Sequence, residues 1–163
     1  MAVSTSALWD LITALLAKFR ADTTIATTYS TLVVDGPLLL NAAPPNILFV
    51  GGTPGDKDMG LPDGVMDQQW GELGARARYE VLSVSCELWC RGGGTDLSVN
   101  RATAQAILAA IESALRIDYT LGLGARLMWC EVRGGQLFQG QTQQGATVRV
   151  PFTIAAKARL ASQ

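Results

Sequence analysis

The chain has 163 residues, 48% of them apolar and 17% charged, and its formal net charge is −1. This length suits a single domain over residues 1–163, and the near-neutral charge excludes a strongly basic surface for duplex nucleic acid as a bulk property. The absence of histidine excludes Ser–His–Asp and Cys–His catalysis and histidine metal sites.

The first fifty residues predict one helix and two short strands. Apolar residues recur at helical spacing between Ser6 and Arg20, which predicts an amphipathic helix with N-cap candidates at residues 4–6. The β-branched run Thr31–Asp35 and the apolar run Asn46–Val50 predict strands, because each is stopped by glycine.

Residues 51–72 differ in composition from the rest of the chain. They are rich in glycine and proline, and their five acids stand against one base, Lys57, which gives a local charge of −4. We interpret this segment as a long extended loop with Trp70 as its anchor onto the body of the domain, since loops of this length are usually functional or disordered. The acids are Asp56, Asp58, Asp63, Asp67 and Glu72.

The second half predicts a strand, a helix and two further strands. Tyr79–Arg91 alternates with period two, and the alanine-rich segment Ser98–Ile117 predicts a helix. Strand patterns return at Ala125–Arg133 and most clearly at Ala146–Leu160, where we expect the even-numbered side chains to face the helices. Residues 136–144 show no clear periodicity.

Strands and helices do not alternate regularly in this order, which argues against a parallel doubly wound sheet. We predict an α+β domain, a mostly antiparallel β-sheet with two helices packed on one face plus the long acidic loop. Pro151 lacks an N–H, so we expect an edge or a bulge at that point of the last strand. The odd set of cysteines, Cys86, Cys90 and Cys130, predicts reduced core residues and no disulfide framework.

Two ligand-binding motifs in the acidic segment fail in detail. A phosphate-binding loop over residues 51–58 would need glycine where Asp56 stands, and Asp58 replaces the magnesium-binding hydroxyl. A calcium loop starting at Asp56 would need glycine at its sixth position and glutamate at its end, where the sequence has leucine and aspartate. We therefore expect no cofactor, no metal and no catalytic residues.

Basic residues gather after Glu131, where the chain has no acid. A solvated sheet face accounts for this distribution in the simplest way. The sharper interpretation pairs these bases with the acidic segment of an adjacent subunit, because complementary patches set register in assemblies. The candidate assembly contacts are Asp56, Asp58, Asp63, Asp67, Arg149, Lys157 and Arg159.

Several short stretches, in a fixed order, carry more information than composition does. They are Val34–Pro37, Leu48–Gly52, Gln69–Gly74, Leu115–Asp118, Leu121–Gly122, Gly134–Leu137, Gln141–Gly145 and Val148–Ile154. Together they resemble the tail terminators (tail-completion proteins) of long-tailed siphophages, especially those of actinobacterial hosts. The resemblance runs from Val34 to Leu160.

This resemblance implies a structural virion protein of the tail and neck, made in the host cytoplasm. It implies a homohexameric ring that caps the tail tube, because a closed ring of head-to-tail contacts halts polymerisation. The implied partners are other copies of the chain, the tail tube protein and the head-side connector or stopper proteins. DNA would pass through the ring lumen without sequence-specific binding, and no membrane is involved.

Two other functions stay open. Another neck component, a head–tail connector or stopper, would bind the portal side instead of the tail tube end. A small-ligand-binding α+β module would have a concave apolar pocket with convergent polar groups. An enzyme without histidine would need a carboxylate or lysine site that the sequence does not reveal.

Overall fold

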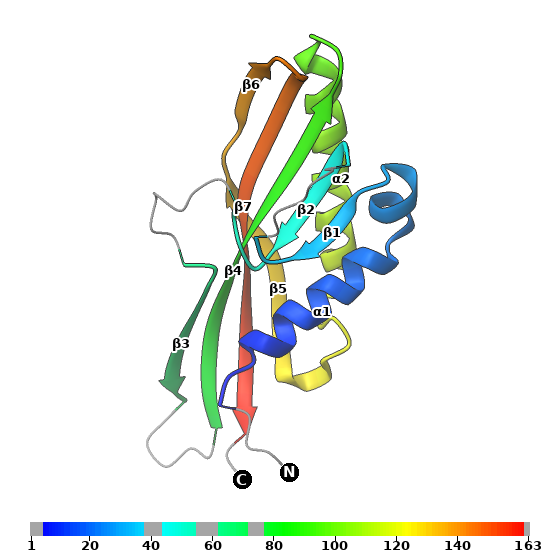
Figure 1. Cartoon of the computed structure of the whole chain (residues 1–163). Coiled ribbons are helices and arrows are strands. Elements are labelled where there is room, and N and C mark those ends of the chain that lie inside the picture. The colour runs from blue at the N-terminus through cyan, green and yellow to red at the C-terminus, as the bar shows by residue number, and fades with distance from the viewer. Residues whose placement is uncertain (1–4, 38–43, 55–61, 72–76, 162–163) are drawn as a thin grey trace.

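The computed structural model of the chain describes residues 5–37, 44–54, 62–71 and 77–161. Both long helices lie on the same side of one twisted sheet (Figure 1). No helix in the described ranges is both long enough and apolar enough to cross a membrane. In chain order the elements are α1 (Leu8–Ala21), the π-helical turn η1 (Thr23–Thr28), β1 (Leu32–Asp35), β2 (Asn46–Val50), β3 (Gly64–Trp70), β4 (Ala77–Gly92), α2 (Leu97–Ile117), the 3₁₀ turn η2 (Gly124–Arg126), β5 (Leu127–Gly135), β6 (Phe138–Thr142) and β7 (Gly145–Ala161).

Two long central strands organise the sheet. β4 and β7 pair antiparallel along their whole length, from Ala77 opposite Ala161 to Gly92 opposite Ala146. Each also takes two shorter partners on its outer side: β3 and β2 flank β4, whereas β5 and β6 flank β7. The pairing is antiparallel except between β1 and β2, so the predicted α+β class with a mostly antiparallel sheet is confirmed.

The core lies between the sheet and the two helices. Val148, Phe152 and Ile154 of β7 are buried in one cluster with Leu11 of α1 and Ile107 of α2. The even-numbered side chains of β7 therefore face the helices, as the period-two pattern predicted. The burial of these large apolar side chains, each contributing about 1.5–3 kcal/mol on transfer from water, is the main force holding the helices on the sheet.

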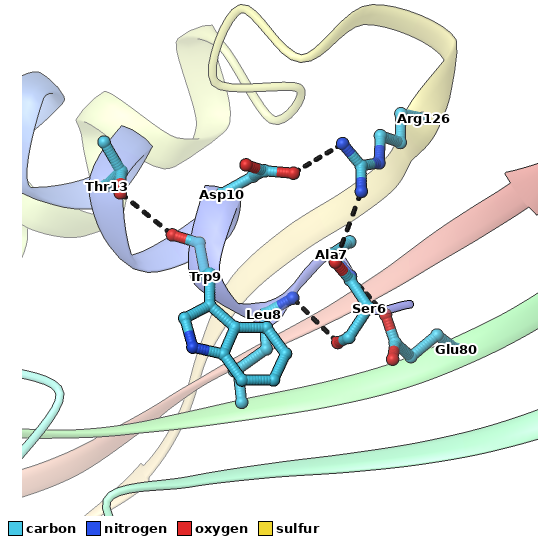
Figure 2. A network of polar contacts seen from close by, with 8 residues as sticks. All are labelled: Ser6, Ala7, Leu8, Trp9, Asp10, Thr13, Glu80 and Arg126. Carbon is cyan, nitrogen blue, oxygen red and sulfur yellow. Dashed lines mark hydrogen bonds and ion pairs between the residues drawn. The ribbon is translucent and has the colours of Figure 1, made fainter. Parts of the chain in front are cut away.

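The start of α1 is held by the sheet and not by a local cap. The N-cap position is Ala7, whose amide donates a hydrogen bond of 2.7 Å to Oε2 of the buried Glu80 of β4. The hydroxyl oxygen of Ser6, one of the predicted N-cap candidates, accepts a hydrogen bond of 3.0 Å from the Leu8 amide. Arg126 joins the same network through an ion pair of 2.5 Å with Asp10 (Figure 2).

Glu80 also ties β3 to this network. Its Oε1 accepts a hydrogen bond of 2.9 Å from Nε2 of Gln68, and the same amide nitrogen donates to the carbonyl of Thr5 at 2.6 Å. Nη1 of Arg78 donates to the amide oxygen of Gln68 at 2.9 Å. One buried carboxylate thus connects a helix start, a central strand and an edge strand.

The prediction of one loop over residues 51–72 is wrong for its second half. Residues Gly64–Trp70 form β3, which pairs with β4 from Gly64 opposite Val84 to Trp70 opposite Arg78. An edge strand with mostly exposed side chains needs no apolar alternation, because backbone hydrogen bonds to β4 hold it. The same reason explains β6, whose five residues are all exposed and whose sequence showed no periodicity.

Pro151 does not lie at a sheet edge, because β7 is a central strand. It sits opposite Glu87 of β4, and on its other side the partner strand changes from β5 to β6. The Pro151 carbonyl accepts from the Gln136 amide at 2.9 Å on that side. A residue's N–H and C=O point to the same side of a strand, so the missing N–H falls where β5 leaves the ladder through a register shift after Arg133.

The three cysteines are free and buried, as predicted. Burial raises the pKa of the Cys86, Cys90 and Cys130 thiols to about 12 in each case. Because only the thiolate is nucleophilic, we expect none of them to react with a thiol reagent at pH 8 in the folded protein, whereas all three react in denaturant. Reductant should leave the thermal midpoint unchanged. A midpoint that falls with reductant would reveal a disulfide instead.

Candidate assembly surface

The face of the sheet that points away from the helices carries most of the polar sheet residues, and we call it the distal face. Odd-numbered residues of β3, β4 and β7, and those of β5 between its two register shifts (residues 129–133), point to it, because side chains alternate along a strand and the registers align odd with odd there. Charged and aromatic side chains are interleaved over these strands: Asp67, Tyr79, Glu87, Trp89, Arg91, Trp129, Glu131, Arg133, Arg149, Lys157 and Arg159.

Trp89 is the best-anchored aromatic residue of the distal face. It packs edge-on against Phe49 at 5.3 Å between ring centroids, beside the buried Val34 and Ile47. The guanidinium carbons of Arg91 and Arg149 lie 4.4 Å and 5.4 Å from the centroid of the same indole ring. Each such cation–π contact contributes about 0.5–2 kcal/mol, so a fixed indole orients two arginines.

The two arginines differ in their ion pairing. Nε and Nη2 of Arg149 lie 2.7 Å and 2.6 Å from Oε1 of Glu87, whose side chain is fully buried. The second oxygen of Glu87 and the indole N–H of Trp89 have no hydrogen-bond partner within the described part of the chain. Arg149, a predicted assembly contact, is therefore already neutralised inside its own subunit, because breaking this pair would leave a buried unpaired carboxylate.

The predicted acidic contacts are only partly within the described residues. Asp56 and Asp58 lie outside them. Asp63, directly before β3, and Asp67, within β3, are exposed. Neither forms an ion pair with another described residue under a 4.0 Å limit.

Two of the predicted bases lie at the same end of the distal face as Asp67. The register aligns Asp67, Val81 and Lys157 across three neighbouring strands, so the two charges are about 10 Å apart. Arg159 is exposed one row further along β7. Arg149 lies eight residues from Lys157, about 26 Å along the strand, and belongs to the other end. The structure thus separates the predicted bases into two groups.

β3 gives this end of the sheet an exposed edge (Figure 1). Val65 and Met66 are each 43% exposed and Trp70 is 68% exposed. The prediction that Trp70 anchors the segment to the body is wrong, because its ring lies at the edge with the Arg78 guanidinium 5.5 Å away. Unpaired backbone groups on an edge strand are a template for another strand, and exposed apolar side chains favour contact with a partner.

The surface of the described residues is also hollowed in places. A groove of about 560 Å³ runs between α2 and the β5–β7 region, over Ala104, Leu108, Val132 and Val150. A second hollow, of about 800 Å³, lies at the end of the distal face where Trp89, Arg91 and Arg149 meet the β6–β7 turn. Within the described ranges, no three Cys, Asp or Glu side chains are grouped to hold a metal ion. The charged and aromatic side chains of the distal face are suited to contact with a partner that carries charged groups.

The sequence interpretation missed Trp89, Arg91 and the buried Glu80 and Glu87. A signal for the first two existed, since Arg91 follows Trp89 by two residues in a period-two strand and must share its face. The buried acids had no such signal. Glu80 lies on the helix face, and its partner amide is 73 residues away in sequence.

Comparison with solved structures shows that this fold occurs in a virion particle. No family model matches the sequence, and no curated protein matches it. A solved chain described as "Virion of native gene transfer agent (GTA) particle" is similar in structure, with a TM-score of 0.63 and 17% sequence identity. The similarity covers 91% of this chain and 94% of that chain. At this identity it shows that the two chains share a fold over nearly their full lengths.

Proposed function

We propose that this chain is a non-enzymatic structural virion protein, a tail terminator. In this proposal six copies form a ring that caps the tail tube and joins the tail to the head-side neck proteins. DNA passes through the lumen without sequence-specific contacts. The ring also stops tube growth. In a closed ring every head-to-tail contact surface is occupied by a neighbouring subunit, so no further subunit can add.

One observation carries this proposal: the near full-length fold shared with a chain of a virion particle. The sequence stretches that resemble tail terminators point in the same direction. The exposed β3 edge and the charged distal face supply what an assembling subunit needs, a surface that is not used up by its own core. Fold alone does not determine function, so the assembly itself has to be measured.

The test is the assembly state of the purified chain alone and with tail tubes. Native mass spectrometry and negative-stain imaging should reveal six-fold rings, and the rings should bind tube ends. A phage lacking the protein should produce tails of uncontrolled length. A chain that never forms a ring and binds neither tube ends nor neck proteins contradicts the proposal.

We infer that the acids of residues 51–72 contact basic residues of an adjacent copy or of a partner. The proposed ion pairs join Asp56, Asp58, Asp63 and Asp67 of one copy to Lys157, Arg159 or Arg149 of the next. Exposed ion pairs contribute only about 0–1 kcal/mol each, so the effect falls on association and register. Changing the four acids to asparagine should weaken ring assembly or tail joining while the thermal midpoint of the subunit stays nearly unchanged.

A matched control separates this contact from net charge. Asp35→Asn with Glu112→Gln removes two exposed acids elsewhere on the chain, and Asp63→Asn with Asp67→Asn removes two from the proposed contact. Both double variants change the net charge equally. Only the second should impair assembly. If the quadruple variant joins tails normally at physiological salt, the acids are merely solvated.

Two alternatives have their own discriminating observations. A connector or stopper would bind the portal–adaptor side and leave tube ends uncapped. The apolar groove along α2 is the feature that a small-ligand module would use, with Arg101 and Glu112 at its rim. Saturable binding of an apolar ligand by a monomer, lost in a Leu108→Asp variant, would favour that module over the virion protein.

A further inference from the structure

The hollow at the end of the distal face is built around Arg91, an arginine with no acidic partner among the described residues. The guanidinium carbon of Arg91 lies 4.4 Å from the Trp89 ring centroid. Arg91 is the residue before Gly92, where β4 ends. The hollow of about 800 Å³ is walled by Pro45 on one side and by residues 142–144 of the β6–β7 turn on the other. It is large enough to admit a side chain together with the backbone that carries it.

Arg91 is a cation without compensation among the described residues. Among the described residues its guanidinium, which carries five N–H donors, forms no ion pair and no hydrogen bond with another side chain. Burial lowers the pKa of Arg91 from its ordinary value, because the charged guanidinium has lost part of its contact with water. Arg149, beside it, is held in place by Glu87 and forms a second, oriented guanidinium.

These groups fit one ligand chemistry. A planar guanidinium presents parallel N–H donors that match the two oxygens of a carboxylate. The Trp89 ring fixes the plane of the Arg91 head group, so little side-chain freedom is lost when an acid binds. The apolar indole and Pro45 suit the methylene group of an aspartate or glutamate.

We propose that this hollow, defined by Trp89, Arg91 and Arg149, receives a carboxylate side chain from the Asp63–Asp67 stretch of a second copy of this chain. The inference rests on the ring assembly of the proposed function. It makes Arg91, and not Arg149, the principal basic partner of the acid, because Arg149 is already paired with Glu87.

Asp63 and Asp67 of the same molecule are too far from Arg91 to enter the hollow. Asp67 pairs with Val81, ten residues from Arg91 along β4, which is about 33 Å. Asp63 is level with Ser85, about 20 Å from Arg91. The acids and the hollow thus lie at separate places on one molecule, as a head-to-tail contact between copies requires. Asp63 and Asp67 are exposed acids with no described ion pair, so their charge complements that of Arg91.

The pocket itself is tested on the full chain with sodium acetate as the probe. Titration is followed by the NMR signals of the Trp89 indole N–H and the Arg91 Nε–H, with sodium chloride at equal ionic strength as reference. We expect saturable shifts with acetate and none with chloride. Arg91→Gln should weaken acetate binding about ten-fold or more, whereas Arg159→Gln, an exposed arginine on the same face, should not change it.

Three outcomes overturn the pocket. They are the absence of saturation, unchanged binding by Arg91→Gln, and tighter binding of inorganic phosphate than of acetate. The last would make the hollow a phosphate site, suited to a nucleic acid backbone, and not a carboxylate site.

The source of the carboxylate is tested by charge reversal. Arg91→Glu and Asp67→Arg should each abolish the ring in native mass spectra, and the double variant should restore it. The same comparison with Asp63→Arg in place of Asp67→Arg shows which of the two acids enters the hollow. Rings that form as well with Arg91→Glu overturn the second-copy contact even if acetate binds. A wild-type chain that stays monomeric under all conditions also overturns the contact between copies. If such a monomer binds acetate and still caps tails, the contact between copies fails while the role at the tail end does not.

Discussion

Phe152→Asp should prevent folding or reduce the free energy of unfolding by several kcal/mol. Phe152 is 4% exposed and lies on the helix face of the central strand β7, within the main core cluster. An aspartate there would lose the burial of the aromatic ring and place a carboxylate in an apolar site. Chemical denaturation followed by circular dichroism measures the loss, and poor soluble expression would be its coarse form.

The neighbouring residue supplies the control. Thr153→Asp introduces the same charge one position along β7, where the side chain points to the half-exposed distal face. Its cost should stay near the value for ordinary surface changes, within about 1 kcal/mol. A Phe152→Asp protein that is soluble, cooperative and as stable as the parent would show that the facing of β7 is wrong.

Glu80→Ala should produce the second-largest effect, a loss of about 2–4 kcal/mol. The carboxylate accepts hydrogen bonds from the Ala7 amide at 2.7 Å and from Nε2 of Gln68 at 2.9 Å. Its removal leaves the buried Ala7 amide without this acceptor and takes one of two acceptors from Gln68. The start of α1 and the β3 edge should loosen together. Hydrogen exchange at the Ala7 amide and denaturant unfolding measure the local and global parts of the effect.

Two variants bracket this expectation. Glu80→Gln keeps one acceptor oxygen and should cost less than Glu80→Ala. Glu112→Ala removes an exposed glutamate from α2 and should stay within about 0.5 kcal/mol of the parent. If Glu80→Ala unfolds at the same denaturant concentration as the parent and Ala7 stays protected from exchange, the buried carboxylate does not hold the helix start.

The elements that face the core were predictable from the sequence. β2 has the predicted bounds Asn46–Val50, and α1, α2, β4 and β7 lie within two residues of theirs. Burial on one side imposes a period of 3.6 or 2 on the side chains, and this period is legible without a structure. The odd number of cysteines and the alternation around them likewise predicted that all three are buried thiols.

The edge strands were not predictable, because nothing packs on them. β3 and β6 are stabilised by backbone hydrogen bonds to β4 and β7, and their exposed side chains carry no periodic pattern. The acidic composition of residues 51–72 suggested a loop for the same reason. Composition describes which side chains meet water, and a strand whose side chains meet water has the composition of a loop.

By itself the sequence determined the α+β class, the core-facing sides of the long elements and the placement of bases and acids along the chain. Only the tertiary structure decided the order of the strands, the parallel pairing of β1 with β2, and the partners of the buried charges. Glu80 meets Ala7 across 73 residues and Glu87 meets Arg149 across 62. Local periodicity indicates whether a side chain is buried. The identity of its partner depends on which strands pair, and strands that are distant in sequence pair only when the whole chain folds.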